Sequence, residues 1–130
     1  MVSDRVGDFI IRLKNAGAIG SPTATMPHSK HLEEIAEKLK SLGFIERVEV
    51  SRKMPATMTI TLAYDERGTH KIRGVKRVSK PGRRLYVPAR DAHTVKNGQG
   101  SRLISTPKGV LSDAEARKVH AGGENLFEIW

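Results

Sequence analysis

Residues 105–118 read STPKGVLSDAEARK. In this run a short apolar strand ends at Ser105, a proline and a glycine turn the chain, and a second strand covers residues 109–111. Ser112 then begins a helix, because Glu115 follows it at the spacing of a capping box. The loop between the strands carries two hydroxyls, a lysine and backbone amides, which are groups that bind nucleic-acid sugars and phosphates. The run predicts strands joined to a helix, with a polar binding loop.

The rest of the chain supports an α+β fold. In the first half, hydrophobic periodicity predicts a helix capped by Ser3 or Asp4 and ending near Gly17, and a second helix from Ser29 to Gly43. Alternating residues predict strands over 23–26, 44–50 and 58–63. In the second half we expect strands over 75–78, 85–87, 102–105, 109–111 and 126–130, a type II turn at Lys80-Pro81-Gly82, and a helical turn over 92–96 ending at Asn97-Gly98.

Composition predicts two small lobes of unequal charge. Around Glu66-Arg67-Gly68-Thr69 the sequence becomes polar, which predicts a boundary between an α/β domain over 1–66 and a mainly β domain over 67–130. The 130 residues carry a net charge of +9, of which residues 1–65 hold +1 and residues 66–130 hold +8. Nine basic residues and no acid lie between Arg67 and Arg90. An anionic partner is therefore expected for the second half.

Several kinds of function are disfavoured by the sequence. There is no cysteine, and no apolar run approaches the roughly 20 residues that cross a bilayer, so we expect neither thiol chemistry nor a membrane partner. His28 and His31 flank a helix start without a carboxylate fixed by spacing, so no metal is predicted. Gly98-x-Gly100 lacks the third glycine of a dinucleotide site, so neither a cofactor nor a small-molecule substrate is expected.

Two alternatives to RNA binding stay open. Ser105 and Lys108 have the Ser-x-x-Lys spacing of a serine acyl transferase, but the companion motifs are absent and Ser105 ends a strand. The helix over 112–119 could enter a DNA major groove, but it is short and carries Asp113 and Glu115 at its leading end. Aromatic residues are sparse, which disfavours a base-stacking surface. Helical RNA, read through phosphates and 2'-hydroxyls, fits the loop best.

The sequence resembles the bacterial form of the small-subunit ribosomal protein eight family over essentially its whole length. The resemblance is carried by VKRVSKPGRRLYV (75–87), NGQG (97–100), STPKGVL (105–111), SDAEAR (112–117), GGE (122–124) and Trp130. Looser matches are Asp4, Asp8, Arg12, Asn15 and MPHSK (26–30).

This resemblance implies a structural protein, not an enzyme, that binds the central domain of small-subunit ribosomal RNA at an irregular helix. It also implies neighbouring ribosomal proteins as partners, the chain's own operon mRNA as a further candidate, and a cytoplasmic or organellar ribosome as the location. The RNA-binding residues that it implies, with Arg102 added as a further phosphate contact, are Ser105, Thr106, Lys108, Gly122, Gly123, Glu124, Lys80, Arg83, Arg84, Tyr86, Arg102, Ser29 and Lys30.

The sequence departs from the family pattern in three places. Pro107 stands where the family usually has a third serine, which removes a hydroxyl and an amide donor from the loop. Gln99, Ser101 and Arg102 replace residues that are usually apolar, and Asp4-Arg5 replaces an Asp-Pro. Tyr86 matches a position near RNA, although its place in a Leu-Tyr-Val strand is equally consistent with burial. We therefore expect the loop at Pro107 to hold RNA differently from its relatives.

Overall fold

The computed structural model describes residues 4–88 and 100–130. The chain divides into two compact units, which we call the first unit (Asp8–Ile72) and the second unit (Arg73–Trp130 together with Met1–Gly7). Each combines helix and sheet, so the α+β prediction is confirmed. The predicted domain boundary after residue 66 stays a prediction. The predicted helical turn over 92–96 and Asn97-Gly98 lie outside the described residues.

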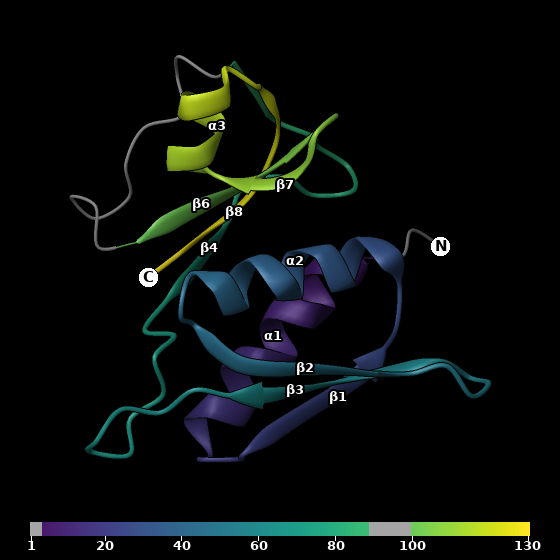
Figure 1. The fold of residues 1–130 in the computed structure, drawn as a ribbon, viewed down its shortest axis with the longest axis vertical. Coiled ribbons are helices and arrows are strands. Elements are labelled where there is room, and N and C mark those ends of the chain that lie inside the picture. Colours follow the sequence, from purple (N-terminus) through teal and green to yellow (C-terminus); the bar gives the residue numbers. More distant parts are fainter. Residues whose placement is uncertain (1–3, 89–99) are drawn as a thin grey trace. The chain divides into compact units, whose positions relative to one another are not determined.

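The first unit is a three-stranded antiparallel sheet with two helices. Its elements are α1 (Arg5–Ala18, whose first turn belongs to the second unit), β1 (Thr23–Pro27), α2 (Lys30–Ser41), β2 (Ile45–Ser51) and β3 (Thr57–Leu62). The strand order is β1-β3-β2, with β3 in the centre (Figure 1). Alternate residues of β1 and β3 are buried, as the period-2 pattern predicts. Helix–strand–helix–strand–strand is the predicted order, and it is confirmed.

Helix α2 shows how local sequence fixes its ends. The Ser29 hydroxyl accepts a hydrogen bond from the Leu32 amide at 3.1 Å, which satisfies one of the free N–H groups of the first turn. The buried face consists of Leu32, Ile35, Ala36 and Leu39. Gly43 follows with a φ of +88°, a conformation that glycine adopts without strain. The predicted cap, apolar face and terminating glycine are all confirmed.

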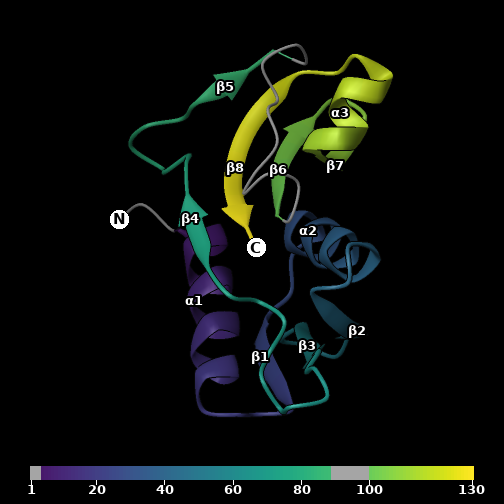
Figure 2. The ribbon, with the colours of Figure 1, turned by 90° about the vertical axis from the view of Figure 1, so that its left-hand side faces the viewer.

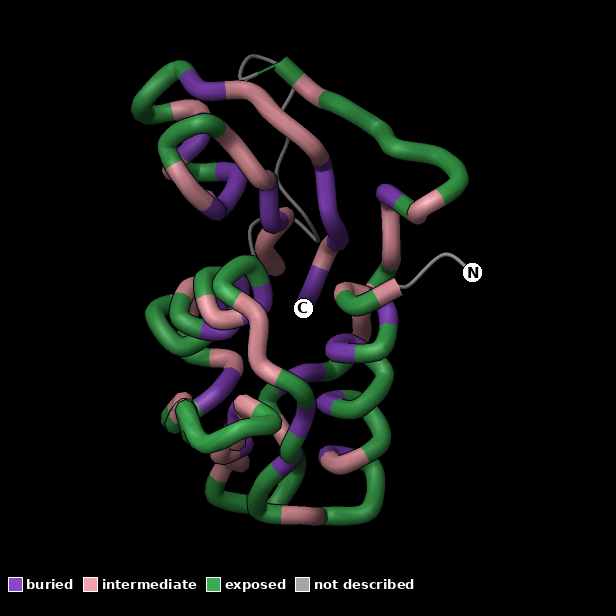
Figure 3. The backbone as a smooth tube through the Cα atoms, turned by 90° about the vertical axis from the view of Figure 1, so that its right-hand side faces the viewer, coloured by how far each residue is buried: buried purple, intermediate pink, exposed green. Residues whose placement is uncertain are grey.

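The second unit is mostly strand. It contains β4 (Val75–Arg77), β5 (Tyr86–Val87), β6 (Ser101–Thr106), β7 (Gly109–Ser112), α3 (Asp113–Val119) and β8 (Gly123–Ile129). The order is β4-β8-β6-β7, and β5 also pairs with β8, which runs between β4 and β6 in Figure 2. The predicted capping box is present, since the Ser112 hydroxyl accepts from the Glu115 amide at 3.2 Å. Burial is concentrated in the C-terminal part of β8 and in β6 (Figure 3).

Two local predictions are wrong. Gly82 does not have a positive φ, so the turn over residues 80–83 is not type II; instead, Lys80 and Arg83 exchange two backbone hydrogen bonds of 2.9 Å. The last strand begins at Gly123, three residues earlier than predicted. The Gly123-Glu124 segment, which lies before the predicted strand, is strand because it pairs with β5 and β6. Among the described residues no helix is both long and apolar enough to span a membrane.

Candidate nucleic-acid interface

The β6–β7 hairpin presents the loop singled out in the sequence. Thr106 and Gly109 pair across the hairpin, and Pro107 and Lys108 form its exposed tip. The Thr106 hydroxyl donates to the Gly109 carbonyl at 2.8 Å and accepts from the Lys108 amide at 3.1 Å. Gly109 has a φ of +107°, which a side chain would strain. The Thr106 hydroxyl therefore holds the turn that carries Lys108.

A row of side chains crosses the sheet at the base of this hairpin. Ser105 of β6 lies opposite Glu124 of β8, and Glu124 lies opposite Tyr86 of β5. Residues directly opposite each other in antiparallel strands project to the same face of the sheet. Tyr86 is 73 % exposed, so burial, the alternative left open for it, does not occur. The structure thus brings Ser105, Glu124 and Tyr86 together.

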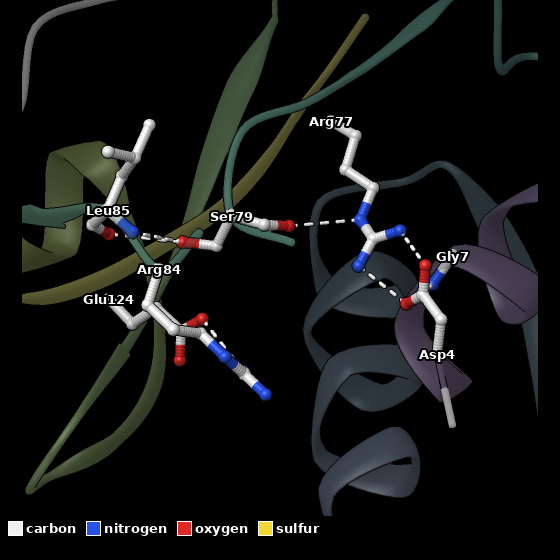
Figure 4. Close-up of polar contacts among 7 residues, drawn as sticks. All are labelled: Asp4, Gly7, Arg77, Ser79, Arg84, Leu85 and Glu124. Carbon is white, nitrogen blue, oxygen red and sulfur yellow. Dashed lines mark hydrogen bonds and ion pairs between the residues drawn. The ribbon is translucent and has the colours of Figure 1, made fainter. Parts of the chain in front are cut away.

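The carboxylate in this row binds a cation. Arg84 Nη1 donates to Glu124 Oε2 at 3.1 Å (Figure 4). The Glu124 side chain is only 15 % exposed, whereas that of Arg84 is 55 % exposed. The carboxylate therefore lies at the sheet surface and holds a guanidinium that still reaches solvent, where it can meet a phosphate.

Gly123 allows the row to form. A Cβ at this position would lie 2.0 Å from the Ser105 carbonyl oxygen, closer than any side chain tolerates. Strands β6 and β8 approach each other here beside an irregularity in their register between Leu103 and Ile104. The glycine at 123 is required by this approach rather than by a turn.

The basic loop between β4 and β5 is closed at its base by Ser79, which sequence reasoning missed. The Ser79 hydroxyl accepts from the Leu85 amide at 2.9 Å and donates to the Leu85 carbonyl at 3.1 Å (Figure 4). Ser79 is buried, and Lys80 and Arg83 are exposed on the loop that it closes. No sequence pattern marks this serine, because its burial and its bonds to Leu85 arise only in the folded chain.

A second missed contact anchors β4. Arg77 forms a bidentate pair with the Asp4 carboxylate, and its Nε donates to the Ser79 carbonyl at 3.0 Å (Figure 4). Asp4 also accepts from the Gly7 amide at 3.0 Å, so it caps α1, one of the two caps predicted. The hydrogen bond from Arg77 lowers the pKa of Asp4 below its ordinary value of 3.8, more than burial raises it. The two residues are far apart in sequence, so no local pattern could reveal this pair.

Arg102 lies in β6 but apart from the Ser105 row. Its Nη2 donates to Glu128 Oε1 at 2.7 Å, and its amide donates to Asp113 Oδ1 at 3.1 Å. The side chain is 15 % exposed. A phosphate contact by Arg102 would therefore compete with Glu128.

Ser29 and Lys30 belong to the first unit, where they begin α2. The Ser29 hydroxyl is engaged with the Leu32 amide, and Lys30 is exposed. Next to them, His28 Nε2 lies 2.8 Å from Glu33 Oε2. The expectation that no carboxylate accompanies His28 is wrong, because the helix start folds Glu33 back onto it. The described residues hold no cluster of three or more groups suited to a metal ion.

Comparison with known proteins decides the family. The model of the family described as ribosomal protein S8 matches residues 4–130. A small ribosomal subunit protein uS8 from Persephonella marina is 43 % identical, with each chain covered completely. Proteins of the same name from Cereibacter sphaeroides and Acholeplasma laidlawii are 42 % and 38 % identical over 98 % or more of each chain. The chain belongs to the ribosomal protein S8 family. The resemblance stated from the motifs is confirmed.

Two alternatives to RNA binding, an acyl transferase and a DNA-binding helix, can be compared with the family and the structure. The S8 family is one of ribosomal proteins rather than enzymes. In this S8-family chain Ser105 lies in a strand and Lys108 in the hairpin turn, so their spacing is not that of a helical turn. In α3, the helix that DNA would have to meet, Asp113 is buried and pairs with Arg117 at 3.1 Å. Neither arrangement supplies the geometry that its alternative needs.

Proposed function

We propose that this protein is a structural component of the small ribosomal subunit that binds the central domain of the subunit's RNA. The observation that carries the proposal is the Ser105–Glu124–Tyr86 row, with Arg84 held at its edge. A hydroxyl, an aromatic ring and a partly exposed guanidinium on one sheet face match the 2'-hydroxyls, bases and phosphates of an irregular RNA helix. Family membership supports this partner, and the proposed location is the ribosome in the cytoplasm.

Affinity and recognition would come from different residues of this surface. Lys80, Arg83, Arg84 and Lys108 are exposed cations, so we assign them to phosphates, which dominate affinity and its salt dependence. Ser105 offers its hydroxyl to the minor groove, where shape and 2'-hydroxyls are read. The Gly122–Glu124 segment forms the other side of the site, because Gly123 and Glu124 pair with β5 and Glu124 also pairs with β6.

The first unit would add a smaller contact. Lys30 is exposed at the start of α2, and its charge favours a phosphate. Ser29 would act by fixing the helix start, because its hydroxyl is engaged with the Leu32 amide. Replacing Ser29 should therefore change helix stability as well as RNA affinity.

The test is RNA binding by the full chain at several salt concentrations. For an irregular helix of small-subunit RNA, Ser105→Ala should weaken affinity threefold to tenfold, the effect of one hydrogen bond. Lys108→Ala should reduce the salt slope by about one. The matched control is Lys14→Ala, an exposed lysine of α1 outside the proposed surface. Unchanged affinity in the Ser105→Ala, Lys108→Ala double variant would overturn the assignment, as would equal affinity for duplex DNA.

Binding of the operon mRNA is a finer part of the proposal. An mRNA helix that repeats the irregular shape of the ribosomal site would present the same hydroxyls and phosphates to Ser105 and Arg84. The two RNAs should then compete for one site, and Ser105→Ala should weaken both to the same degree. If the mRNA binds simultaneously with the ribosomal fragment, this part of the proposal is wrong.

A further inference from the structure

The two edges of the β1-β3-β2 sheet differ in their free hydrogen-bonding groups. The His28 amide donates to the Ala56 carbonyl, and the Leu62 amide donates to the Pro22 carbonyl, both at 3.0 Å. These two hydrogen bonds fix which residues of β1 and β3 bond to each other. Alternate residues of an antiparallel strand bond to opposite neighbours. Thr59 and Thr61 therefore bond to β2, and the backbones of Val48 and Val50 point away from the sheet.

The β1 edge is closed by the chain itself. Its outward carbonyls belong to Thr23, Thr25 and Pro27, and proline has no N–H to offer. The Ser21 hydroxyl donates to the Thr23 carbonyl at 2.8 Å, and Arg12 Nη1 donates to the Thr25 carbonyl at 3.0 Å. Blocking of this kind protects a sheet edge against pairing with another strand.

The β2 edge carries no such block. Among the described residues, none donates to or accepts from the outward backbone groups of Val48 and Val50. Their side chains are half-buried on the sheet face that α2 covers. Arg47 and Glu49 lie on the opposite face, exposed and 2.9 Å apart at their charged atoms. The seven-residue strand β2 thus lies at the edge of the sheet (Figure 1). The outward backbone groups of its residues Val48 and Val50 are open.

We propose that the free edge of β2 pairs with an extended segment of a partner protein, which adds a fourth strand to the sheet. Strand addition of this kind takes affinity from the main chain and specificity from alternate side chains. The partner class, a neighbouring protein of the small subunit, rests on the proposed function, whereas the edge itself does not.

Charge and packing define the segment. In antiparallel pairing, the partner residues opposite Glu49, Val48 and Arg47 occur in that order from the N-terminus of the partner segment. Charge and packing therefore favour a basic, an apolar and an acidic residue at these three successive positions. Its apolar residues would cover Val48 and Val50 beneath α2. Pairing of β2 with the β2 of a second copy is disfavoured. Because α2 packs on β2, the two α2 helices would lie about one strand spacing, 4.8 Å, apart. Packed helices need an interaxial distance of roughly 8–10 Å.

The experiment uses two synthetic peptides and the full chain without RNA. One peptide, Thr-Val-Lys-Val-Glu-Thr, has the expected order, and the other has Lys and Glu exchanged. The first should bind about tenfold more tightly, because two cross-strand charge pairs change from attraction to repulsion. In the Arg47→Glu, Glu49→Arg variant the preference should reverse. Bound peptide should slow hydrogen exchange at the Val48 and Val50 amides.

Proline substitutions locate the site. Val48→Pro removes an outward N–H without touching the β2–β3 ladder, and it should abolish peptide binding. Thr25→Pro removes the equivalent N–H at the β1 edge and should leave binding unchanged. Equal affinity for both peptides, or amide protection confined to residues outside β2, would overturn the proposal. Because no RNA is present, either result leaves the RNA proposal untouched.

Discussion

Gly123 and Ser105 approach so closely that a Cβ on Gly123 would lie 2.0 Å from the Ser105 carbonyl oxygen. This approach aligns Glu124 with Ser105 and Tyr86, on which the proposed RNA surface depends. The backbone of residue 123 therefore determines the position of side chains that reach the surface.

We expect Gly123→Ala to destabilise the protein by about 2 kcal/mol, because overpacking forces the backbone of β6 or β8 to shift. Chemical denaturation measures the change. Gly82→Ala is the control, since a Cβ there meets open space and the residue has no positive φ. If both variants are equally stable, the close approach of the strands is not rigid.

The contact between Asp4 and Arg77 predicts a pH dependence. Because the pKa of Asp4 is lowered in the folded chain, its contribution is present above the ordinary value of 3.8 and is lost as pH falls through the folded value. Asp4→Asn should destabilise by up to about 1 kcal/mol at pH 7, through loss of the charge that Arg77 binds, because asparagine caps a helix as well as aspartate does. The effect of the ion pair is small, because the Asp4 side chain is 38 % exposed.

Thermal unfolding of both proteins between pH 7 and pH 2.5 measures this dependence. The difference in Tm should shrink below about pH 4, where Asp4 of the parent becomes protonated. Asp8→Asn is the control, because Asp8 pairs with Arg12 on the exposed side of the same helix. A difference in Tm that stays constant across this pH range would contradict the assignment to Asp4.

Local signals in the sequence predicted most elements, and non-local contacts explain the failures. The cap and apolar face of α2 follow from residues within one or two turns, so they could be predicted. The start of β8 could not, because Gly123 and Glu124 become strand only by pairing with β5 and β6. The Ser105 loop was found from residue types, but Ser79 and the Asp4–Arg77 pair depend on partners that no pattern specifies.

Arg102 and Lys108 should respond differently to removal of their charge. Arg102→Met leaves the covered Glu128 carboxylate without its partner, so we expect a loss of about 2 kcal/mol of stability. Lys108→Met should leave stability unchanged, because the side chain is exposed at the hairpin tip. Denaturation and the salt dependence of RNA binding, measured on both variants, separate the two roles. A salt slope that falls by about one in Arg102→Met would show that Arg102 also contacts a phosphate.

Pro107 offers a test by restoration. It lies at the exposed tip of the β6–β7 hairpin, where it supplies neither a hydroxyl nor an amide donor. Pro107→Ser should raise affinity for the RNA helix threefold to tenfold, the effect of one added hydrogen bond. Stability should fall by up to about 1 kcal/mol, because the unfolded chain regains freedom that proline removes.

Pro88→Ser is the matched control, an exposed proline of the second unit that follows β5 and is not assigned an RNA contact. It should leave RNA affinity unchanged, so a gain specific to Pro107→Ser would assign the added hydrogen bond to the hairpin tip. Combining Pro107→Ser with Ser105→Ala distinguishes a direct contact from a loosened loop. A direct contact keeps its gain when the Ser105 hydroxyl is absent, whereas a gain that disappears would mean that Pro107 acts only by orienting Ser105.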